Sequence, residues 1–215
     1  VRLTLPTHAN TTDYAVGDWV LADPQSHLLH RRLARKTVLE RRLEGGKIPQ
    51  LIAANVDTLF IVTSCNADFN PARLERYLAL ANEAGTDPVI VLTKADTVAD
   101  AEVYLTQARA LQRGLVAVSL NAKSPDAVQT LAPWCNSGQT VALIGSSGVG
   151  KSTLLNTLVG PDQDAPQATG GIREADAKGR HTTTARSLHA IQGGGWVIDT
   201  PGMRSLHVSD VAFGI

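Results

Sequence analysis

The hydrophobic positions of residues 54–200 form short continuous runs that alternate with segments of helical spacing. The runs have strand length, and their lack of polar alternation predicts strands covered on both faces. These runs lie at residues 56–64, 88–93, 115–119 and 140–145. Alternating strands and helices predict an α/β domain with a mainly parallel sheet, helices on both faces, and a site at the carboxyl ends of the strands.

Helices are predicted between these strands. The first has Asn70 as its N-cap, Pro71 at its first position and Gly85 as its stop. Its apolar residues fall on one face at Leu74, Tyr77, Leu78 and Ala81. Further helices are expected at residues 102–113 and 126–131. Residues 187–200, "SLHAIQGGGWVIDT", predict two strands joined by a glycine turn.

Residues 1–50 follow another pattern. The stretch "YAVGDWVLAD" (14–23) alternates loosely around a Gly-Asp turn, which suits short strands of a small barrel. In such a barrel, Trp19 is expected to be a core residue rather than a stacking platform. We therefore expect a partial barrel with a linker at 1–50 and the larger α/β domain at 51–215.

Composition changes this picture little. Hydrophobic residues make up 43% and charged residues 19%, as in ordinary globular proteins. Basic and acidic residues balance at 20 each, so the net charge indicates neither a nucleic-acid nor a membrane partner. No apolar run reaches membrane-spanning length, and Cys65 and Cys135 have no metal or disulfide spacing. We expect a soluble, cytoplasmic protein with no membrane partner.

The segment "GSSGVGKS" between a predicted strand and an amphipathic helix matches the phosphate-loop pattern G-x-x-x-x-G-K-[ST]. Its glycines let backbone N–H groups turn toward phosphates, and the helix N-terminus adds a favourable potential. Lys151 is expected to reach the β- and γ-phosphates and to be catalytic, while Ser152 is expected to bind Mg²⁺. The predicted phosphate contacts are Gly145, Ser146, Ser147, Gly148, Val149, Gly150, Lys151, Ser152 and Thr153.

The segment "TKAD" (93–96) favours GTP over ATP because it follows a buried strand, where a base-reading loop would lie. The Asp96 carboxylate can accept two hydrogen bonds from the guanine edge, and adenine has no matching pair of donors. The motif alone is weak evidence for a guanine site, because a solvent-exposed loop between a strand and a helix can have the same four residues. The predicted guanine contacts are Thr93, Lys94, Asp96, Ser119 and the backbone of Leu120.

The segment "DTPG" (199–202) ends the last apolar strand. We expect Asp199 to serve the Mg²⁺ site through a water molecule, and the Gly202 N–H to contact the γ-phosphate. Between the two phosphate motifs lies the polar stretch "GIREADAKGRHTTTAR", which has the length of a switch segment. One threonine of residues 182–184 is expected to complete the coordination shell of Mg²⁺ when the triphosphate is bound, and we predict that it is Thr183.

The order of these motifs is unusual. A conventional GTPase runs from the phosphate loop to the base-reading loops, whereas here the base-reading loops come first. The set is therefore complete but circularly permuted, which compact domains tolerate because their termini often lie close together.

The chain resembles the circularly permuted, ribosome-associated GTPases of the RsgA (YjeQ/YloQ) family. The resemblance is carried by "VGDWV", "IAANVD", "LERYL", "TKAD", "GSSGVGKSTLLN", "KGRHTTTAR" and "DTPGM". It implies an oligonucleotide-binding (OB-type) barrel, a permuted GTPase domain, and a C-terminal zinc domain whose Cys/His cluster this sequence lacks. It also implies GTP hydrolysis to GDP in late maturation of the small (30S) ribosomal subunit, stimulated by that subunit.

One departure concerns the base-reading loop. Thr93 stands where the family usually has Asn, which puts in question a hydrogen bond between that loop and the phosphate loop.

A second feature concerns catalysis. Met203 follows D-x-x-G, where many GTPases have a water-orienting Gln, so another group must orient the water. His181 is the candidate that the resemblance supports, and a solvated surface histidine is the alternative.

The simplest interpretation of the basic run at residues 31–47 is a solvent-exposed charged surface. Because the run lies on a small barrel beside a GTPase switch, binding to rRNA phosphates is the favoured hypothesis. The candidate residues are Arg31, Arg32, Arg35, Lys36, Arg41 and Arg42. We favour a monomeric, GTP-hydrolysing assembly factor. The alternative is an RNA-binding placeholder in which GTP is mainly a structural ligand, and an ATPase or small-molecule kinase would require that Asp96 reads no guanine.

Overall fold

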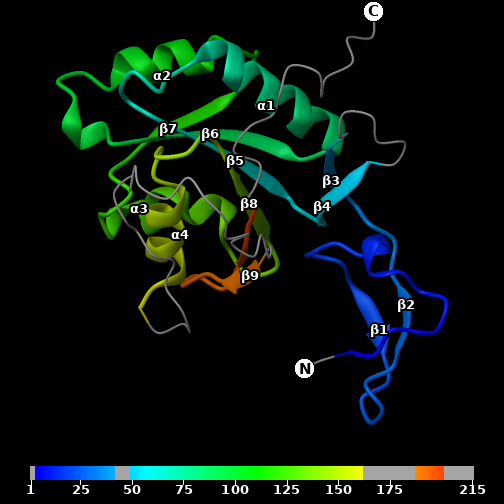
Figure 1. Ribbon diagram of the computed structural model, residues 1–215. Helices are drawn as coiled ribbons and strands as arrows, with labels where there is room; N and C mark the ends of the chain where they lie inside the picture. Colours follow the sequence, from blue (N-terminus) through cyan, green and yellow to red (C-terminus); the bar gives the residue numbers. More distant parts are fainter. Residues whose placement is uncertain (1–2, 42–48, 162–186, 201–215) are drawn as a thin grey trace, which may run out of the picture.

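The computed structural model describes residues 3–41, 49–161 and 187–200 (Figure 1). Several predicted site residues lie outside these ranges, namely Arg42, His181, Thr183 and Gly202. The largest element is a six-stranded sheet in the order β7-β6-β5-β8-β10-β9. Its strands are β5 (Thr58–Ser64), β6 (Asp87–Thr93), β7 (Val116–Ser119), β8 (Thr140–Ile144), β9 (Ser187–Ala190) and β10 (Trp196–Asp199). Neighbouring strands are parallel except for the β9–β10 pair, which is antiparallel.

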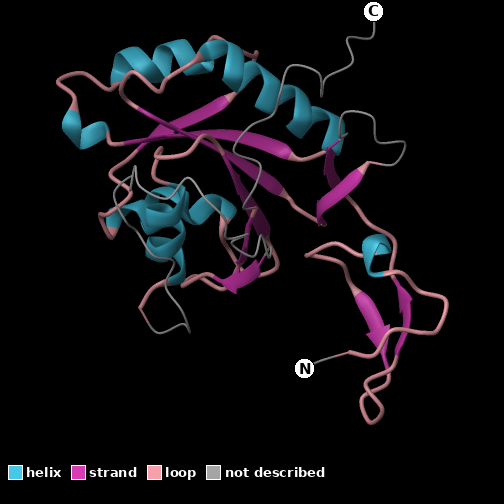
Figure 2. Cartoon of the chain, in the orientation of Figure 1, coloured by secondary structure: helices cyan, strands magenta, loops and turns pink. Residues whose placement is uncertain are grey.

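Helices cover both faces of this sheet, as predicted. Helices α1 (Pro71–Ala84) and α2 (Glu102–Arg109) lie on one face, and α3 (Asp126–Leu131) and α4 (Lys151–Val159) lie on the other (Figures 1 and 2). Short 3₁₀ turns η2 (Ala95–Thr97) and η3 (Ala132–Trp134) follow β6 and α3.

The two faces have separate cores, and strand β5 shows why its sequence is continuously apolar. Leu59 and Ile61 belong to the core under α1 and α2, whereas Phe60 and Val62 belong to the core under α3 and α4. All seven residues of β5 are buried. Since a fully buried aliphatic side chain contributes about 1.5–3 kcal/mol, both covering layers are needed to stabilise this strand.

The predicted ends of α1 are confirmed. The Asn70 side chain accepts a hydrogen bond from the Arg73 amide at 3.0 Å, Pro71 opens the helix, and Gly85 ends it with φ of 74°. The predicted apolar face is also buried against the sheet. These local signals act within one helical turn, which is why sequence alone suffices for them.

Two predicted boundaries differ from the structure by two residues or more, and those of β6, β7 and β8 differ by one residue. Helix α2 ends at Arg109 rather than at residue 113, because the Leu111 amide turns back to the Ala108 carbonyl, a tighter three-residue spacing. Strand β5 starts at Thr58 rather than at residue 56, because the Val56 carbonyl accepts the Thr37 hydroxyl at 2.7 Å instead of pairing in the sheet.

A small unit of residues 3–36 precedes the sheet. It contains η1 (Thr11–Asp13) and a two-stranded antiparallel sheet of β1 (Val20–Ala22) and β2 (Leu29–Arg32), which fits a portion of an OB-type barrel. The prediction that Trp19 is a core residue is wrong, because its side chain is 67% exposed. A two-stranded sheet is too thin to bury a side chain of that size.

A second hairpin links the small unit to the large sheet. It is formed by β3 (Val38–Arg41) and β4 (Gln50–Ala54), and it crosses the domain boundary expected at residue 50. Leu39 and Ile52 of this hairpin lie in the same core as α1. The hairpin therefore packs with the larger unit.

The small unit meets the rest of the chain through directional contacts. The Ala54 amide donates to the Val16 carbonyl at 2.9 Å, and the Asn55 side chain donates to the Gly17 carbonyl at 2.9 Å. A Cβ at Gly17 would lie 2.0 Å from the Ala54 carbonyl oxygen, so only glycine permits this approach.

An ion pair lies inside the small unit, next to the junction. Both the Nε and one terminal nitrogen of Arg35 bind the Asp18 carboxylate at 2.7 Å. Burial acts to raise the pKa of Asp18, but the Arg35 hydrogen bond, the Ala15 amide, and the charges of Arg35 and Arg32 outweigh it and lower that pKa.

Candidate nucleotide-binding site

The phosphate loop leaves β8 at Gly145 and enters α4 at Lys151. Gly145, Gly148 and Gly150 all have positive φ, of 150°, 80° and 96°. A Cβ at Gly145 would lie 2.1 Å from the Val62 carbonyl oxygen of β5. The first glycine of the motif is therefore required by close backbone packing as well as by the turn.

The Lys151 side chain stabilises the phosphate loop by hydrogen bonds to its backbone. Its Nζ donates to the Gly145 carbonyl at 2.7 Å and to the Ser146 carbonyl. Ser147 and Gly148 are exposed at the loop tip, while the Val149 side chain is buried with Leu154 and anchors the second half of the loop. Ser152 and Thr153 lie in the first turn of α4, where backbone N–H groups favour an anion.

The base-reading loop is tied to the phosphate loop by Thr93. Its buried hydroxyl lies 2.5 Å from the Val149 carbonyl and 3.1 Å from the Thr63 carbonyl. A hydroxyl has one proton to donate, and the shorter distance favours Val149. The connection that the Asn-to-Thr departure put in question is therefore made by the threonine hydroxyl.

The residues after Thr93 turn the loop outward. Lys94 has φ of 57°, and Asp96 lies in η2 with an exposed side chain. The loop after β7 supports this turn, because the Leu120 amide donates to the Leu92 carbonyl at 2.9 Å and its carbonyl accepts from the Ala95 amide at 3.4 Å. Ser119 is the last residue of β7 and is half-buried.

Asp199 stands one strand away from the phosphate loop. It ends β10, pairs in register with Leu143 of β8, and is 8% exposed. The neighbouring Thr200 hydroxyl donates to the Leu143 carbonyl at 2.6 Å, which fixes the exit of the strand. The carboxylate of Asp199 and the hydroxyl of Ser152 are oxygen ligands of the kind that Mg²⁺ prefers, so these residues fit that ion.

Sequence reasoning missed one contact of the phosphate loop. Arg73, in the first turn of α1, donates from Nη1 to the Ser146 hydroxyl at 2.5 Å. No local pattern could reveal this pair, since 73 positions separate the two residues. The contact arises because β5, which leads into α1, lies next to β8 in the sheet.

The basic candidates of residues 31–41 are in different surroundings. Arg31, Arg32 and Lys36 are exposed, and Arg41 is half-buried. Arg35 is held by Asp18 and also donates to the Asp13 carbonyl at 2.9 Å. Its guanidinium therefore orders the small unit.

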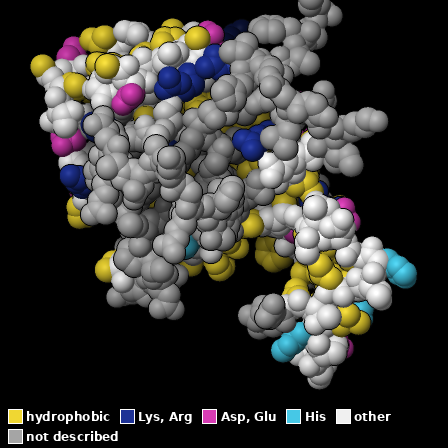
Figure 3. All heavy atoms as spheres, in the orientation of Figure 1, with side chains coloured by type: hydrophobic (Ala, Val, Ile, Leu, Met, Phe, Trp, Pro, Cys, Tyr) yellow, Lys and Arg dark blue, Asp and Glu magenta, His cyan; other side chains and the backbone are white. Residues whose placement is uncertain are grey.

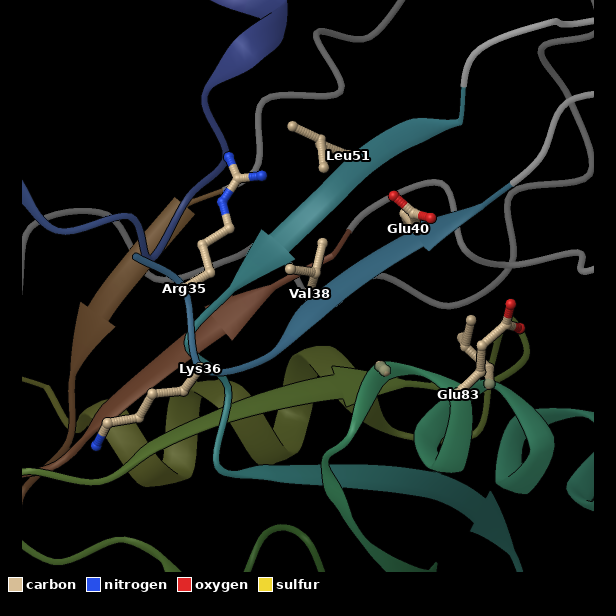
Figure 4. A pocket seen from close by; sticks show the side chains of 8 residues that line it. Arg35, Lys36, Val38, Glu40, Leu51 and Glu83 are labelled. Carbon is tan, nitrogen blue, oxygen red and sulfur yellow. The ribbon is translucent and has the colours of Figure 1, made fainter. Parts of the chain in front are cut away.

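A pocket of about 480 Å³ lies between the β3–β4 hairpin and the C-terminal half of α1 (Figure 4). Its polar lining mixes Arg35 and Lys36 with Glu40 and Glu83, and Arg35 is already paired with Asp18. None of the predicted phosphate or guanine contacts that the structure describes lines it. The pocket is therefore separate from the candidate site.

Among residues 3–41, 49–161 and 187–200, no helix has the length and apolar character needed to cross a membrane. Within the same ranges, no group of three or more His, Cys, Asp or Glu side chains is placed to hold a metal ion.

The loops at the ends of β6, β7, β8 and β10 thus meet at one edge of a mainly parallel sheet. Together with the motif order, they define a circularly permuted P-loop GTPase domain. The sequence model of the RsgA GTPase matches residues 32–209, and the chain belongs to the RsgA GTPase family.

Similar proteins agree with this assignment. The chain is 75% identical over 213 residues to a small ribosomal subunit biogenesis GTPase RsgA of Mesorhizobium japonicum, covering 99% of this chain and 62% of that protein. It is 54% identical to a small ribosomal subunit biogenesis GTPase RsgA 2 of Vibrio vulnificus, covering 100% of this chain and 60% of the relative. The chain thus spans about three fifths of the length of these relatives.

Solved structures show the same fold. The crystal structure of YjeQ from Thermotoga maritima matches with a TM-score of 0.62 and 26% identity, over 91% of this chain and 63% of that one. YloQ, described as a circularly permuted GTPase, matches with a TM-score of 0.62 and 24% identity, over 95% of this chain and 62% of that one.

Proposed function

We propose that this protein hydrolyses GTP to GDP and phosphate and acts in the maturation of the small ribosomal subunit. Family membership and the names of the relatives support the activity and the partner. The observation that supports a single nucleotide site is the Thr93 hydroxyl 2.5 Å from the Val149 carbonyl, because this bond joins the loop that bears Asp96 to the phosphate loop. The guanine preference itself would come from the Asp96 carboxylate.

Each end of the nucleotide has a set of candidate partners. The backbone of residues 145–153 and the Lys151 ammonium would hold the phosphates, with the Gly202 N–H at the γ-phosphate. Asp96 would accept hydrogen bonds from the guanine edge, and the Lys94 stem would lie along the base. Ser119 and Leu120 would complete the base site, with Leu120 acting by shaping the loop, because both its backbone groups are bonded to neighbouring strands and turns.

Ser152, Asp199 and Thr183 would hold Mg²⁺, with Asp199 acting through water. When bound, the ion neutralises the charge that develops on the phosphate oxygens. The buried position of Asp199, one strand from the loop, supports its part in this set.

His181 would orient the attacking water, since Met203 cannot. A partner that positions His181 against the attacking water would then stimulate hydrolysis. We expect the small subunit to be that partner, and the exposed Arg31, Arg32 and Lys36, with Arg41 and Arg42, to contact rRNA phosphates. We also place the β3–β4 hairpin with the GTPase domain, because Leu39 and Ile52 pack under α1.

The decisive test is GTP turnover by the whole protein, with and without purified small ribosomal subunits, and with ATP as the control nucleotide. We expect slow GTP turnover that rises sharply with subunits, and negligible ATP turnover. Turnover that is indifferent to subunits would remove the ribosome as activator. Equal use of ATP would contradict the guanine role of Asp96.

Lys151→Ala separates hydrolysis from a placeholder role. Losing a preorganised cation at the phosphates costs a factor of about 10²–10³ in turnover. If hydrolysis drives release, this variant stays on the subunit in sedimentation assays. If it leaves the subunit like the wild type, nucleotide is only a structural ligand.

A further inference from the structure

The tip of the phosphate loop lies between two polar contacts from outside the loop. After the tip, the Val149 carbonyl lies 2.5 Å from the Thr93 hydroxyl of β6. Before the tip, the Ser146 hydroxyl lies 2.5 Å from Nη1 of Arg73 in α1. The exposed residues Ser147 and Gly148 lie between these contacts.

The contact at Ser146 is built by more than one group. Arg73 is half-buried and lies in the capped first turn of α1, with its backbone amide held by Asn70. One turn further along the same helix lies the buried Tyr77, whose pKa is raised by burial and lowered in part by the Arg73 charge and the Ser146 hydroxyl. Lys151 holds the carbonyl of the same serine from inside the loop. Ser146 therefore joins α1 to the phosphate loop.

Sheet order explains why α1 can reach the loop. Strand β5 pairs with β8 in parallel, and the Gly145 backbone passes against the Val62 carbonyl. The chain that leaves β5 therefore enters α1 beside the phosphate loop. A guanidinium fixed at this place holds the loop in one conformation before nucleotide arrives, and such preorganisation lowers the cost of binding.

We propose that Arg73 is a positioning residue for the nucleotide, and that it acts through the Ser146 hydroxyl to hold the first half of the phosphate loop in its phosphate-binding conformation. This inference rests on the proposed guanine-nucleotide function. It assigns to α1 a role in binding that the phosphate-loop motif does not contain. The bond is charge-assisted, which makes it stronger than a bond between two neutral groups.

The test compares nucleotide affinity in the whole protein with fluorescent mant-GDP and a mant-labelled, non-hydrolysable GTP analogue as probes. Arg73→Met keeps the length of the side chain but removes the donor. We expect it to weaken both probes on the order of tenfold, the usual effect of losing one charge-assisted bond. In turnover assays the loss should fall on KM rather than on kcat, because the positioned loop acts on binding.

A double-mutant cycle shows whether Arg73 acts through Ser146. If it does, Ser146→Ala weakens binding, and adding Arg73→Met to it causes little further loss. Arg73→Lys, which keeps a charged donor, should recover part of the affinity. Arg76→Met is the matched control, because it removes the same charge from the same helix, and it should bind both probes within about twofold of the wild type.

The outcomes separate this inference from the proposed function. If the wild type fails to bind mant-GDP and the GTP analogue, the proposed function itself is wrong. If the wild type binds and Arg73→Met binds equally well, only the role of Arg73 is wrong. Additive losses in the double mutant, or equal losses for Arg76→Met, would also overturn it. Melting temperatures of all variants identify any loss of affinity that comes from unfolding.

Discussion

The six-stranded sheet and the small unit of residues 3–36 are stabilised by different forces. All seven residues of β5 are buried between two helical layers, whereas β2 has one buried residue, Leu29, out of four. Figure 3 shows hydrophobic side chains on the surface of the small unit, which fits the exposure of Leu3, Trp19, Leu21, Leu28 and Leu33. The sheet is held by apolar burial, and the small unit depends on directional contacts at its junction.

This difference indicates how each region responds to mutation. A densely packed sheet tolerates the loss of one polar bond, because many other contacts remain. A thin unit depends on the Gly17 approach and the Asn55 side chain at its junction, and on the Asp18–Arg35 pair within it, so it is sensitive to the loss of any one of them. We therefore expect junction variants to move the small unit while leaving nucleotide binding intact.

The largest effect is expected for Gly17→Ala. The new Cβ would meet the Ala54 carbonyl at 2.0 Å at a residue with φ of 94°, so the junction must open. We expect a loss of about 3 kcal/mol in the free energy of unfolding, or separation of the small unit. Thermal unfolding and limited proteolysis measure this loss, and mant-GDP affinity should not change.

Gly114→Ala is the matched control for Gly17→Ala. Gly114 also has positive φ, 75°, but nothing lies within 4 Å of an added Cβ. Gly114→Ala should lower the free energy of unfolding by only about 1–2 kcal/mol, the cost of placing a non-glycine residue at positive φ. Equal losses in both variants would show that the junction contact with Ala54 contributes nothing.

A smaller effect is expected for Asp18→Asn, which removes the charge that Arg35 binds. The loss should be about 2 kcal/mol at neutral pH, because the change weakens charge-assisted hydrogen bonds between side chains that are only 4% and 11% exposed. The pKa of Asp18 is lowered below its ordinary 3.8 in the folded state. Its stabilisation is therefore present above about pH 4 and is lost as the pH falls through the lowered pKa.

The measurement for Asp18 is the free energy of unfolding from neutral pH down to about pH 3. The wild type should lose more stability over this range than Asp18→Asn does. Parallel pH curves for the two proteins would show that the Asp18 carboxylate does not link stability to pH.

Thr93→Val tests the bond between loops in the large sheet. The isosteric change leaves the Val149 carbonyl without its hydroxyl donor, at a cost of about 1 kcal/mol in stability. GTP affinity should fall severalfold, because the base and phosphate loops are no longer joined. Thr93→Ser keeps the hydroxyl and should restore affinity. If the Thr93→Val variant binds GTP as tightly as the wild type, packing rather than the Thr93–Val149 hydrogen bond aligns the two loops.

The smallest effect is expected for Trp19→Ala. A side chain that is 67% exposed should change the free energy of unfolding by less than about 0.5 kcal/mol. Chemical denaturation measures this value. A loss of about 3 kcal/mol or more, typical of a buried tryptophan, would show that the small unit buries Trp19 in solution.

The sequence by itself determined the local features of this protein. The buried strands, the capped ends of α1 and the glycines of the phosphate loop can each be recognised in a short stretch of sequence, and the structure confirms them. The permuted order of the motifs could also be read directly from the chain. The exposure of Trp19 could not, because an alternating pattern does not say how many layers will cover a strand.

Only the tertiary structure decided which distant residues meet. Thr93 reaches Val149 across 56 positions, and Arg73 reaches Ser146 across 73. It also decided that Arg35 pairs with Asp18 and that the β3–β4 hairpin packs under α1. These contacts depend on strand order, and strand order is set by the packing of two whole faces, which no short stretch of sequence contains.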